Sequence, residues 1–477
     1  MRKQRLLPCK NSFGTRGIIP SILVMAVVLG GIATAQEPEI SFSSFTLDQA
    51  INLALGHNEF LQQVQAEIEG SKGTLLAAKS GQLPHLDLTG RYARNLRNPS
   101  FFLPPAMGNA FGVSGPIPMG SDNDVLAAVT VTYNLWTAGR LAAAEGVATE
   151  LLTATQFKEV AIADGVLFTV VVAYHDVLLA SENLKTADKS LAAAEESQRV
   201  ARSGFEQGTL SNFDFLRARV EVANRQAPLI SARNDLAQTM LVLERRCGLL
   251  PATIVSLADS LGGVTAPAEQ DSLVKLMLQE SSEIQALSHS VAAAKQGVML
   301  QKAGNNPMLV LSGDYALQSQ WDNGLVPGDN EMALSSKVAL GFAFPIFDGK
   351  RTSGLVSRAS ANLLKAELEL ERVTREKELS VRQAWLGLAN ALAALEGRTE
   401  AVSLAEESYR LALVRMTNGL ATPLERLDAE VALTSARVQQ SAVKYACNVA
   451  EARLALAVGS ASSPYLNNNH SQEIDNE

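Results

Sequence analysis

Two spacings of apolar residues divide the chain into helical and extended stretches. Long stretches place apolar residues three and four positions apart, which predicts amphipathic helices, and short stretches alternate apolar with polar residues, which predicts β-strands. The helical spacing is strictest from Arg140 to Arg202, where it follows a period of about 3.5 residues. Such a period predicts left-handed supercoiling against neighbouring helices. The stretch is also far longer than an ordinary globular helix, so we expect long coiled-coil helices.

The predicted elements follow the same order in both halves of the chain. Helices are expected over residues 46–80, 140–202, 211–247 and 269–303, and a second helical hairpin follows the first at an offset of 211. Four amphipathic strands are expected, with apolar positions at Leu86, Leu88, Gly90 and Tyr92; Ala127, Val129, Val131, Tyr133 and Leu135; Leu309, Leu311, Gly313 and Tyr315; and Val338, Leu340, Phe342, Phe344 and Ile346. Residues 98–124, which are rich in proline, and residues 319–332 are expected to be loops.

An internal repeat accounts for this order. Residues that match at the offset of 211 include AEES at 194–197 with AEES at 405–408, Gly208 with Gly419, and Leu216 with Leu427. Pro84 and Pro307 match at an offset of 223, because the first proline-rich loop is longer than the second. We therefore expect two structural repeats, residues 36–267 and 268–459. The polar residues 460–477 are expected to form a disordered tail.

Each repeat contains a tight turn between two long helices. Gly208 and Gly419 occupy the position at which glycine ends a helix in the left-handed conformation. Three residues later, Ser211 and Thr422 stand where an N-cap belongs. An acidic residue follows each cap at the capping-box spacing, Asp214 in the first repeat and Glu425 in the second. These turns are predicted to be the tips of two helical hairpins.

The N-terminus resembles a secretory signal peptide over residues 1–35. A basic leader precedes an apolar run from Ile18 to Ile32, and Ala33-Thr34-Ala35 provides a small-x-small cleavage site. A retained anchor is the alternative, although the apolar run is short for a membrane span. The chain has 41 basic and 49 acidic residues, and loss of the leader's five basic residues gives a net charge near −13. That charge argues against a nucleic-acid partner.

No motif for catalysis or metal binding is present. The five histidines are not spaced as metal ligands are; they are His57, His85, His175, His289 and His470. The sequence also has no motif for a catalytic nucleophile or for phosphate binding. Cys247 and Cys447 fall at different heights along the paired helices, so an intrachain disulfide is not expected. We therefore expect no enzymatic activity, no cofactor and no metal ion.

The strands predict a membrane β-barrel that several chains close together. Four strands with one apolar face each cannot cover that face alone, and their outer edges would have no partner. Alternation of this length suits a closed barrel in a membrane. Aromatic residues that could form the belt of such a barrel are Phe45, Trp136 and Trp321, with Phe101 and Phe102 more typical of ordinary loop contacts. The helices would then continue the barrel into an aqueous compartment.

Several segments resemble the outer membrane efflux protein family, the TolC-like outer membrane factors. These segments are TLDQAINLALGHNEFLQQVQAEIE, KSGQLPHLDLTGRY, FPIFDGKR and NGLATPLERLDAEVAL, and the resemblance covers residues 46–459. It implies a homotrimer in the outer membrane, with a 12-stranded β-barrel continued by an α-helical tunnel in the periplasm. It also implies a periplasmic adaptor and an inner-membrane pump as partners, and export of small molecules or proteins as the function.

The resemblance also suggests roles for residues at the tips. In relatives, a tyrosine and an arginine beside the tip glycine bind an aspartate of the other hairpin. Asp214 matches that aspartate, but Met416 and Ala421 replace the two partners. We therefore expect this lock to be absent. Glu425 and Asp428 match acidic residues at the pore entrance, although Glu425 also fits a capping role.

Two other classes of protein remain open from the residues alone. A periplasmic adaptor also presents a helical hairpin tip, but adaptors have one hairpin, whereas this chain has two together with four amphipathic strands. A cytosolic or anchored coiled-coil scaffold would explain the long helices. The predicted strands and signal peptide argue against it.

Overall fold

The computed structural model describes residues 44–98, 100–102, 112, 116–254, 256–322, 332–418 and 420–459. All of them belong to one compact unit, Ser41–Glu477. The predicted signal peptide at 1–35, the tip glycine Gly419 and the tail at 460–477 lie outside the described residues.

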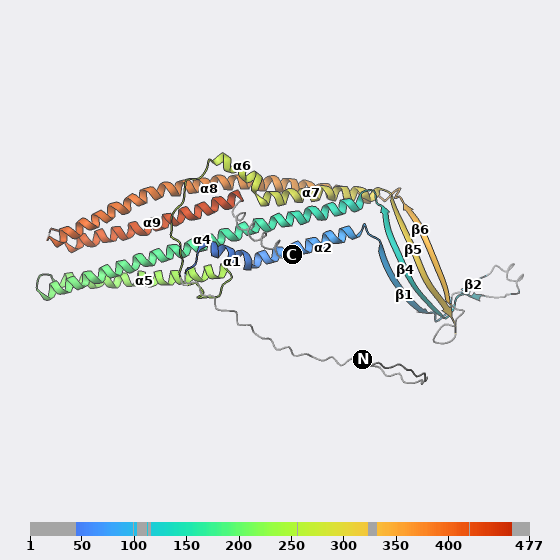
Figure 1. The fold of residues 1–477 in the computed structure, drawn as a ribbon, viewed down its shortest axis with the longest axis horizontal. Coiled ribbons are helices and arrows are strands. Elements are labelled where there is room, and N and C mark those ends of the chain that lie inside the picture. The colour runs from blue at the N-terminus through green and yellow to red at the C-terminus, as the bar shows by residue number, and fades with distance from the viewer. Residues whose placement is uncertain are drawn as a thin grey trace, which may run out of the picture. The chain divides into compact units, whose positions relative to one another are not determined.

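Long helices dominate the described part of the chain. Their bounds are α1 Leu47–His57, α2 Glu59–Ser80, α4 Arg140–Glu206, α5 Asn212–Arg246, α6 Gln270–Glu280, α7 Ser282–Lys302, α8 Arg351–Thr417 and α9 Pro423–Val458, with a short 3-10 helix η1 at Ala303–Asn305. Helices α4 and α8 have 67 residues each, which corresponds to about 100 Å. Helix α4 packs on α5 and α8 packs on α9, so the two predicted hairpins are present (Figure 1).

Helix α4 connects the hairpins to each other and to the shorter helices. It contacts α5, α9, α7 and α2. One window of α4 is apolar enough to cross a membrane, but 61% of that window is buried against other helices. Its apolar side chains therefore form the core between helices. This arrangement agrees with the strict heptad-like spacing that predicted the helix.

The strands form one four-stranded antiparallel sheet. Its order is β1-β4-β5-β6, and the strand bounds are β1 His85–Arg94, β4 Asn123–Trp136, β5 Met308–Trp321 and β6 Met332–Ala343. The two halves of the chain meet where β4 pairs with β5. Strands β1 and β6 are the edges, and neither outer edge has a partner among the described residues.

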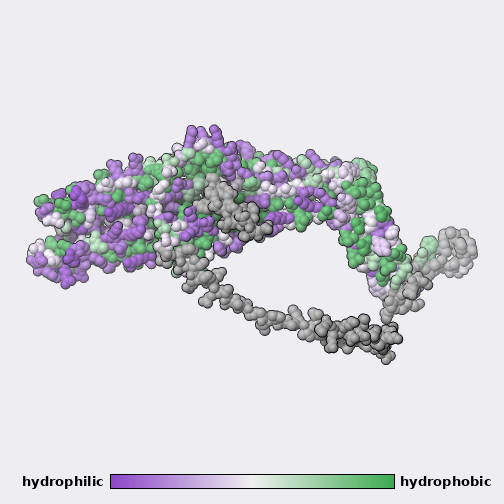
Figure 2. Space-filling view, viewed as in Figure 1, coloured by the Kyte–Doolittle hydropathy of each residue, from purple (hydrophilic) through white to green (hydrophobic). Residues whose placement is uncertain are grey.

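The register places the predicted apolar positions on one face of the sheet. One row across the strands contains Leu86, Val131, Gly313 and Val338. Most side chains of this face are exposed, for example Leu88 at 79% and Val338 at 80%. Figure 2 shows hydrophobic surface gathered over the sheet, whereas hydrophilic surface dominates the hairpin tips. An apolar face of this kind needs a partner other than water.

The opposite face of the sheet is polar. One row across it contains Asp87, Thr130, Asp314 and Lys337. The Thr130 hydroxyl donates a hydrogen bond to Asp314 Oδ1 at 3.0 Å. The sheet therefore has one face suited to lipid and one suited to water, as the period-two spacing predicted.

The prediction of single helices before each strand pair was wrong. Asn58 separates α1 from α2, and Ser281 separates α6 from α7; both residues have extended backbone conformations. Asn58 interrupts the helix because its side chain accepts a hydrogen bond from the Phe60 N–H at 2.9 Å and caps α2. The two breaks lie 223 residues apart, the offset found from the sequence for the paired prolines.

The strand and loop boundaries also differ from the predictions. Phe344 and Ile346 were placed in the fourth strand, but β6 ends at Ala343 because Pro345 has no N–H for the ladder. The expected loop at 98–124 contains a small two-stranded sheet, β2 Ser100–Phe101 with β3 Ile117–Pro118. Strand β4 begins at Asn123, earlier than expected.

One predicted belt aromatic, Phe45, lies in the helical part, and a second, Trp321, is the last residue of β5. Phe45 is fully buried in a cluster where α1 and the segment after α5 pack on α4. Its position is fixed by a bridge to Leu257. Trp321 is 5% exposed and lies beside Tyr92, with ring centroids 6.4 Å apart. Trp136, at the end of β4, is 51% exposed and Phe102 is 74% exposed, so an interfacial position stays open for Trp136.

The helical cluster around Phe45 also contains a polar network. The Tyr174 hydroxyl lies 2.6 Å from Asp259 Oδ2 and 2.9 Å from the Phe45 carbonyl oxygen. Asp259 Oδ2 also accepts a hydrogen bond from the Leu47 N–H. Burial, together with the Asp259 carboxylate, raises the pKa of Tyr174. The network holds Phe45, which precedes α1, and Asp259, which follows α5, against Tyr174 in the middle of α4.

The two cysteines of the described chain are free, as expected. Cys247 and Cys447 are both buried. Burial raises the pKa of the Cys247 thiol to about 12, so it stays protonated and unreactive near neutral pH.

Candidate functional site

The two hairpin tips are the candidate site, because the sequence singled out residues there. In the first tip, Gly208 follows α4 with a φ of +73°, the left-handed conformation predicted for it. Asp214 Oδ2 accepts hydrogen bonds from the Ser211 hydroxyl at 2.7 Å and from the Ser211 N–H at 3.3 Å. The Asp214 N–H donates to Ser211 Oγ at 3.2 Å. The predicted capping box is therefore present.

The first tip is also held by an aromatic pair. Phe205 near the end of α4 and Phe215 at the start of α5 stack with ring centroids 5.9 Å apart and an interplanar angle of 6°. The Arg219 guanidinium lies 5.9 Å from the centre of the Phe215 ring. These contacts close the first hairpin on itself.

The second tip has the corresponding capping box. Thr422 caps α9, and the Glu425 N–H donates to Thr422 Oγ1 at 3.3 Å. The Glu425 carboxylate accepts from the Thr422 N–H at 3.4 Å and lies 3.8 Å from the Arg415 guanidinium. Glu425 is thus a capping residue with a nearby cation. Gly419, the tip glycine of this hairpin, is not among the described residues.

Asp428 has a different environment from Glu425. It is exposed, one turn beyond the cap, and its carboxylate has no hydrogen bond or ion pair within the described part of the chain. Of the two acidic residues predicted at the pore entrance, Asp428 is therefore the one without a structural role inside the single chain.

A link between the two hairpins was missed by the sequence reasoning. The Arg426 guanidinium on α9 donates a hydrogen bond to Ser197 Oγ on α4. It also donates to Glu430 Oε2 at 2.8 Å. Arg426 is 8% exposed and Glu430 is 6% exposed, so the ion pair is buried. At the repeat offset of 211, Arg426 corresponds to Phe215. Because the equivalent residue in the first repeat is apolar, the repeat did not predict a polar contact at Arg426.

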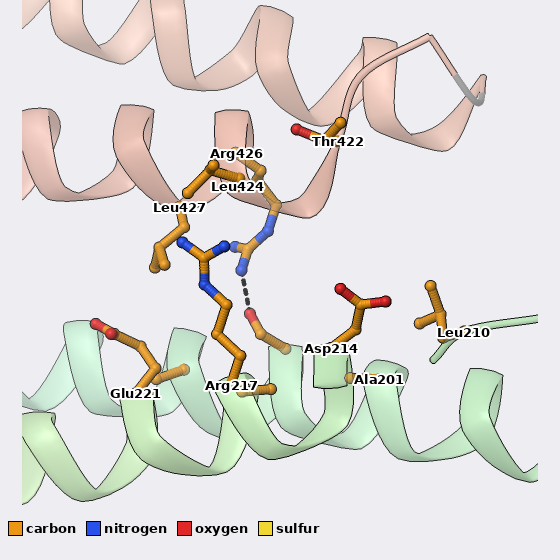
Figure 3. Close-up of a pocket in the computed structure, with 12 residues that line it drawn as sticks. Ala201, Leu210, Asp214, Arg217, Glu221, Thr422, Leu424, Arg426 and Leu427 are labelled. Atoms are coloured by element: carbon orange, nitrogen blue, oxygen red, sulfur yellow. Dashed lines mark hydrogen bonds between the residues drawn. The ribbon is translucent and has the colours of Figure 1, made fainter. Parts of the chain in front are cut away.

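Figure 3 shows Arg426 extending from α9 toward α4 across a cavity of about 230 Å³. Asp214, Arg217 and Leu427 also line this cavity. The structure therefore brings Asp214 close to the second hairpin, where the resemblance placed it. Within the described residues the hydrogen bonds of its carboxylate go to Ser211 alone, whereas Arg426 makes a hydrogen bond between the hairpins near the tips.

No group of three or more histidine, cysteine, aspartate or glutamate side chains that could hold a metal occurs among the described residues. The side chains at the tips cap helices, pair charges and connect hairpins. This arrangement can set the width and charge of an opening.

Comparisons with known proteins agree with this architecture. The model of the family described as outer membrane efflux protein matches residues 50–249 and 273–460. The alkaline protease secretion protein AprF of Pseudomonas aeruginosa is 27% identical over 66% of this chain and 65% of its own length. The outer membrane efflux protein BepC of Brucella suis is 26% identical over 61% of this chain and 63% of its own length. The chain thus spans slightly less than two thirds of each relative.

A solved structure shows the same fold. The outer membrane protein VceC of Vibrio cholerae superimposes with a TM-score of 0.71 at 20% identity, over 87% of this chain and 96% of that protein. The alternatives of an adaptor or a scaffold are not favoured by these matches. The sequence expectation of a mixed helical and strand channel-tunnel fold is confirmed. The chain therefore belongs to the outer membrane efflux protein family, located in the outer membrane with its helical part in the periplasm.

Proposed function

We propose that the protein is a channel-tunnel that exports small molecules or proteins across the outer membrane. The observation that carries this proposal is the four-stranded sheet, which has one exposed apolar face, one polar face and two edges without a partner strand among the described residues. A sheet of this kind is stable in a membrane only when its edges are closed. The long hairpins start directly beyond the sheet and supply a passage away from the membrane.

Three copies would close the barrel, as the resemblance to the family implies. Pairing β6 of one copy with β1 of the next in a ring of three produces twelve strands, an even number within the range of bacterial barrels. A barrel from one chain would have four strands, too few to enclose a passage. The polar row through Asp87 and Asp314 would then line the lumen. Each copy would contribute two structural repeats, residues 36–267 and 268–459.

The hairpin tips would form the periplasmic entrance. Their surface is mostly hydrophilic (Figure 2), with exposed apolar side chains such as Phe213 among the polar ones. The resemblance to the family supports a periplasmic adaptor and an inner-membrane pump as partners there. The printed names of the relatives include both protease secretion and efflux, which supports either class of cargo. We further propose that Asp428, with Glu425 as a lesser contributor, forms an acidic ring at this entrance.

Channel activity in a planar bilayer tests the proposal. Purified full-length protein should insert and give discrete current steps of one main size. Material purified in the same way from the outer membranes of cells that lack the gene is the control, and it should give no current steps. Protein that inserts into lipid vesicles but never conducts would contradict the proposed function.

A further inference from the structure

A second cavity lies where the sheet meets the helices, and the residues that line it are distant in sequence from the hairpin tips. Its volume is about 600 Å³. The ends of β4, β5 and β6 and the start of α4 enclose it, with lining residues that include Thr132, Asn134, Arg140, Met308 and Phe344. None of these residues has a role in the hairpin tips or in the capping boxes.

The register shows which face of the sheet the cavity occupies. Thr132 and Asn134 alternate with Val131 and Tyr133 along β4 and therefore share the face of Thr130, which is the polar face. Met308 lies on the same face of β5 as Asp314. The cavity consequently opens on the face that lines the lumen in the proposed trimer, and the lumen-facing position rests on that proposed function.

One charge dominates the lining. Arg140 is the only charged residue that lines the cavity. Its guanidinium has no hydrogen bond or ion pair with any described residue. Two hydroxyl groups, those of Thr132 and Thr137, also line the cavity; Thr137 Oγ1 accepts from the Leu141 N–H, so its O–H can donate elsewhere. Asn134 and Asn306 also line the cavity, but their side-chain N–H groups donate to the Gly81 and Ala138 carbonyl oxygens. The free side-chain donors at the cavity are therefore the Arg140 guanidinium and the two hydroxyls.

The remaining wall is apolar. Leu141, Met308, Val310, Phe344 and Pro345 contribute it. A guanidinium beside two hydroxyl donors and an apolar wall is suited to a ligand that carries one anionic group on an apolar body. The volume is sufficient for a small molecule of this kind. Neither a cation nor a fully polar ion would use both parts of the lining.

We propose that this cavity is a binding site for small amphipathic anions, such as aromatic or aliphatic carboxylates and sulfonates, as they pass through the channel. Arg140 binds the anionic group, and Phe344 with Met308 contacts the apolar body. The site gives the lumen a preference for such cargo that is separate from the acidic tips. It lies beyond the entrance, so a molecule reaches it only after entering the tunnel.

Single-channel recording with naphthalene-2-sulfonate tests the proposal. The added sulfonate should cause reversible interruptions of the current, with a concentration dependence that gives an apparent Kd. Arg140→Gln should raise that Kd roughly tenfold or more, because a hydrogen-bonded charge pair is lost, and Arg140→Lys should raise it less. The neutral naphthalene-2-sulfonamide should interrupt the wild-type current much more weakly.

Two further variants separate binding from a general effect of charge. Phe344→Ala should weaken the sulfonate interruptions without changing the reversal potential in potassium chloride, because it removes apolar contact and no charge. Arg199→Gln, an exposed cation on the same helix, is the matched control and should leave the interruptions unchanged.

The outcomes distinguish this inference from the proposed function. Channels that conduct normally but show equal sulfonate interruption in wild type and Arg140→Gln would overturn the binding site alone. Equal effects of Arg140→Gln and Arg199→Gln would also overturn it. Absence of any channel in the wild type would instead contradict the proposed function.

Discussion

The guanidinium of Arg426 on α9 donates a hydrogen bond to the hydroxyl of Ser197 on α4, and so joins two hairpins across 229 residues of sequence. The same guanidinium forms a buried ion pair with Glu430 at 2.8 Å. If the entrance widens when the hairpins separate, this hydrogen bond has to break. The contact that the family resemblance implies for Asp214 is absent among the described residues, and Arg426 with Ser197 connects the two hairpins instead.

Arg426→Met should raise single-channel conductance several-fold, since it removes the hydrogen bond that joins the hairpins near their tips. It should also destabilise the protein by about 3–5 kcal/mol, because Glu430 stays buried without its partner. The double variant Arg426→Met, Glu430→Met should recover most of that stability and keep the high conductance. Bilayer recordings and thermal unfolding measure the two effects separately. Unchanged conductance in both variants would show that this contact does not hold the entrance closed.

Asp214→Ala should lower stability without opening the channel. The Asp214 carboxylate completes the cap of α5 through Ser211, and loss of a cap costs about 1 kcal/mol. Asp214→Glu is a conservative control that can still accept those hydrogen bonds. A several-fold rise in the conductance of Asp214→Ala would mean that Asp214 does hold the hairpins together.

The channel should select cations at neutral pH and be blocked by multivalent cations from the periplasmic side. About six carboxylates, from Glu425 and Asp428 in three copies, would surround a narrow opening and attract cations. Asp428→Asn should weaken selectivity more than Glu425→Gln, because Glu425 lies near Arg415. Reversal potentials under a salt gradient give the comparison. Identical reversal potentials in wild type and the double variant would show that neither carboxylate sets the selectivity, and that both residues only belong to the first turns of α9.

His175 should make stability depend on pH. The ring is 8% exposed, and burial lowers its pKa below the ordinary 6.5. The hydrogen bond with the Val171 carbonyl oxygen and the charges of Asp176 and Asp259 oppose this shift with smaller contributions to the pKa. As pH falls below 6.5, the unfolded chain therefore takes up a proton before the folded chain does. Stability is full above pH 6.5 and declines as pH falls toward the lower folded pKa. In His175→Gln the thermal midpoint should fall less between pH 7.5 and pH 5; an equal fall would exclude His175 as the cause.

Period and spacing predicted most of the fold from the sequence. The alternation in the strands and the 3.5-residue spacing in α4 reflect which side chains face away from water. They therefore predicted the type of each element and the two faces of the sheet. Asn58 was missed because the apolar spacing continues on both sides of it, although an asparagine followed by Glu59 is a helix-start signal. Ser281 marks the equivalent break 223 residues later, but Ser282 follows it and the Ser281 side chain makes no capping hydrogen bond among the described residues.

The contacts of Phe45 and Arg426 could not be predicted in the same way. Phe45 precedes the first helix. From the sequence alone, an aromatic residue at that position cannot be assigned to a membrane belt rather than to a helical core. Arg426 and Glu430 are four residues apart, the usual pattern of a solvated helix face. Only the packing of α9 on α4 buries them. Local patterns predict elements, whereas these contacts depend on how distant elements pack.

The mass of the protein in detergent tests the central claim most directly. We expect native mass spectrometry of the protein extracted from outer membranes to give three times the mass of the processed chain, and boiling to release single chains. Three copies would give a closed barrel of twelve strands, whereas the four strands of one chain are too few to enclose a passage. A single chain or a dimer that keeps its β-structure and conducts current would contradict the trimeric channel.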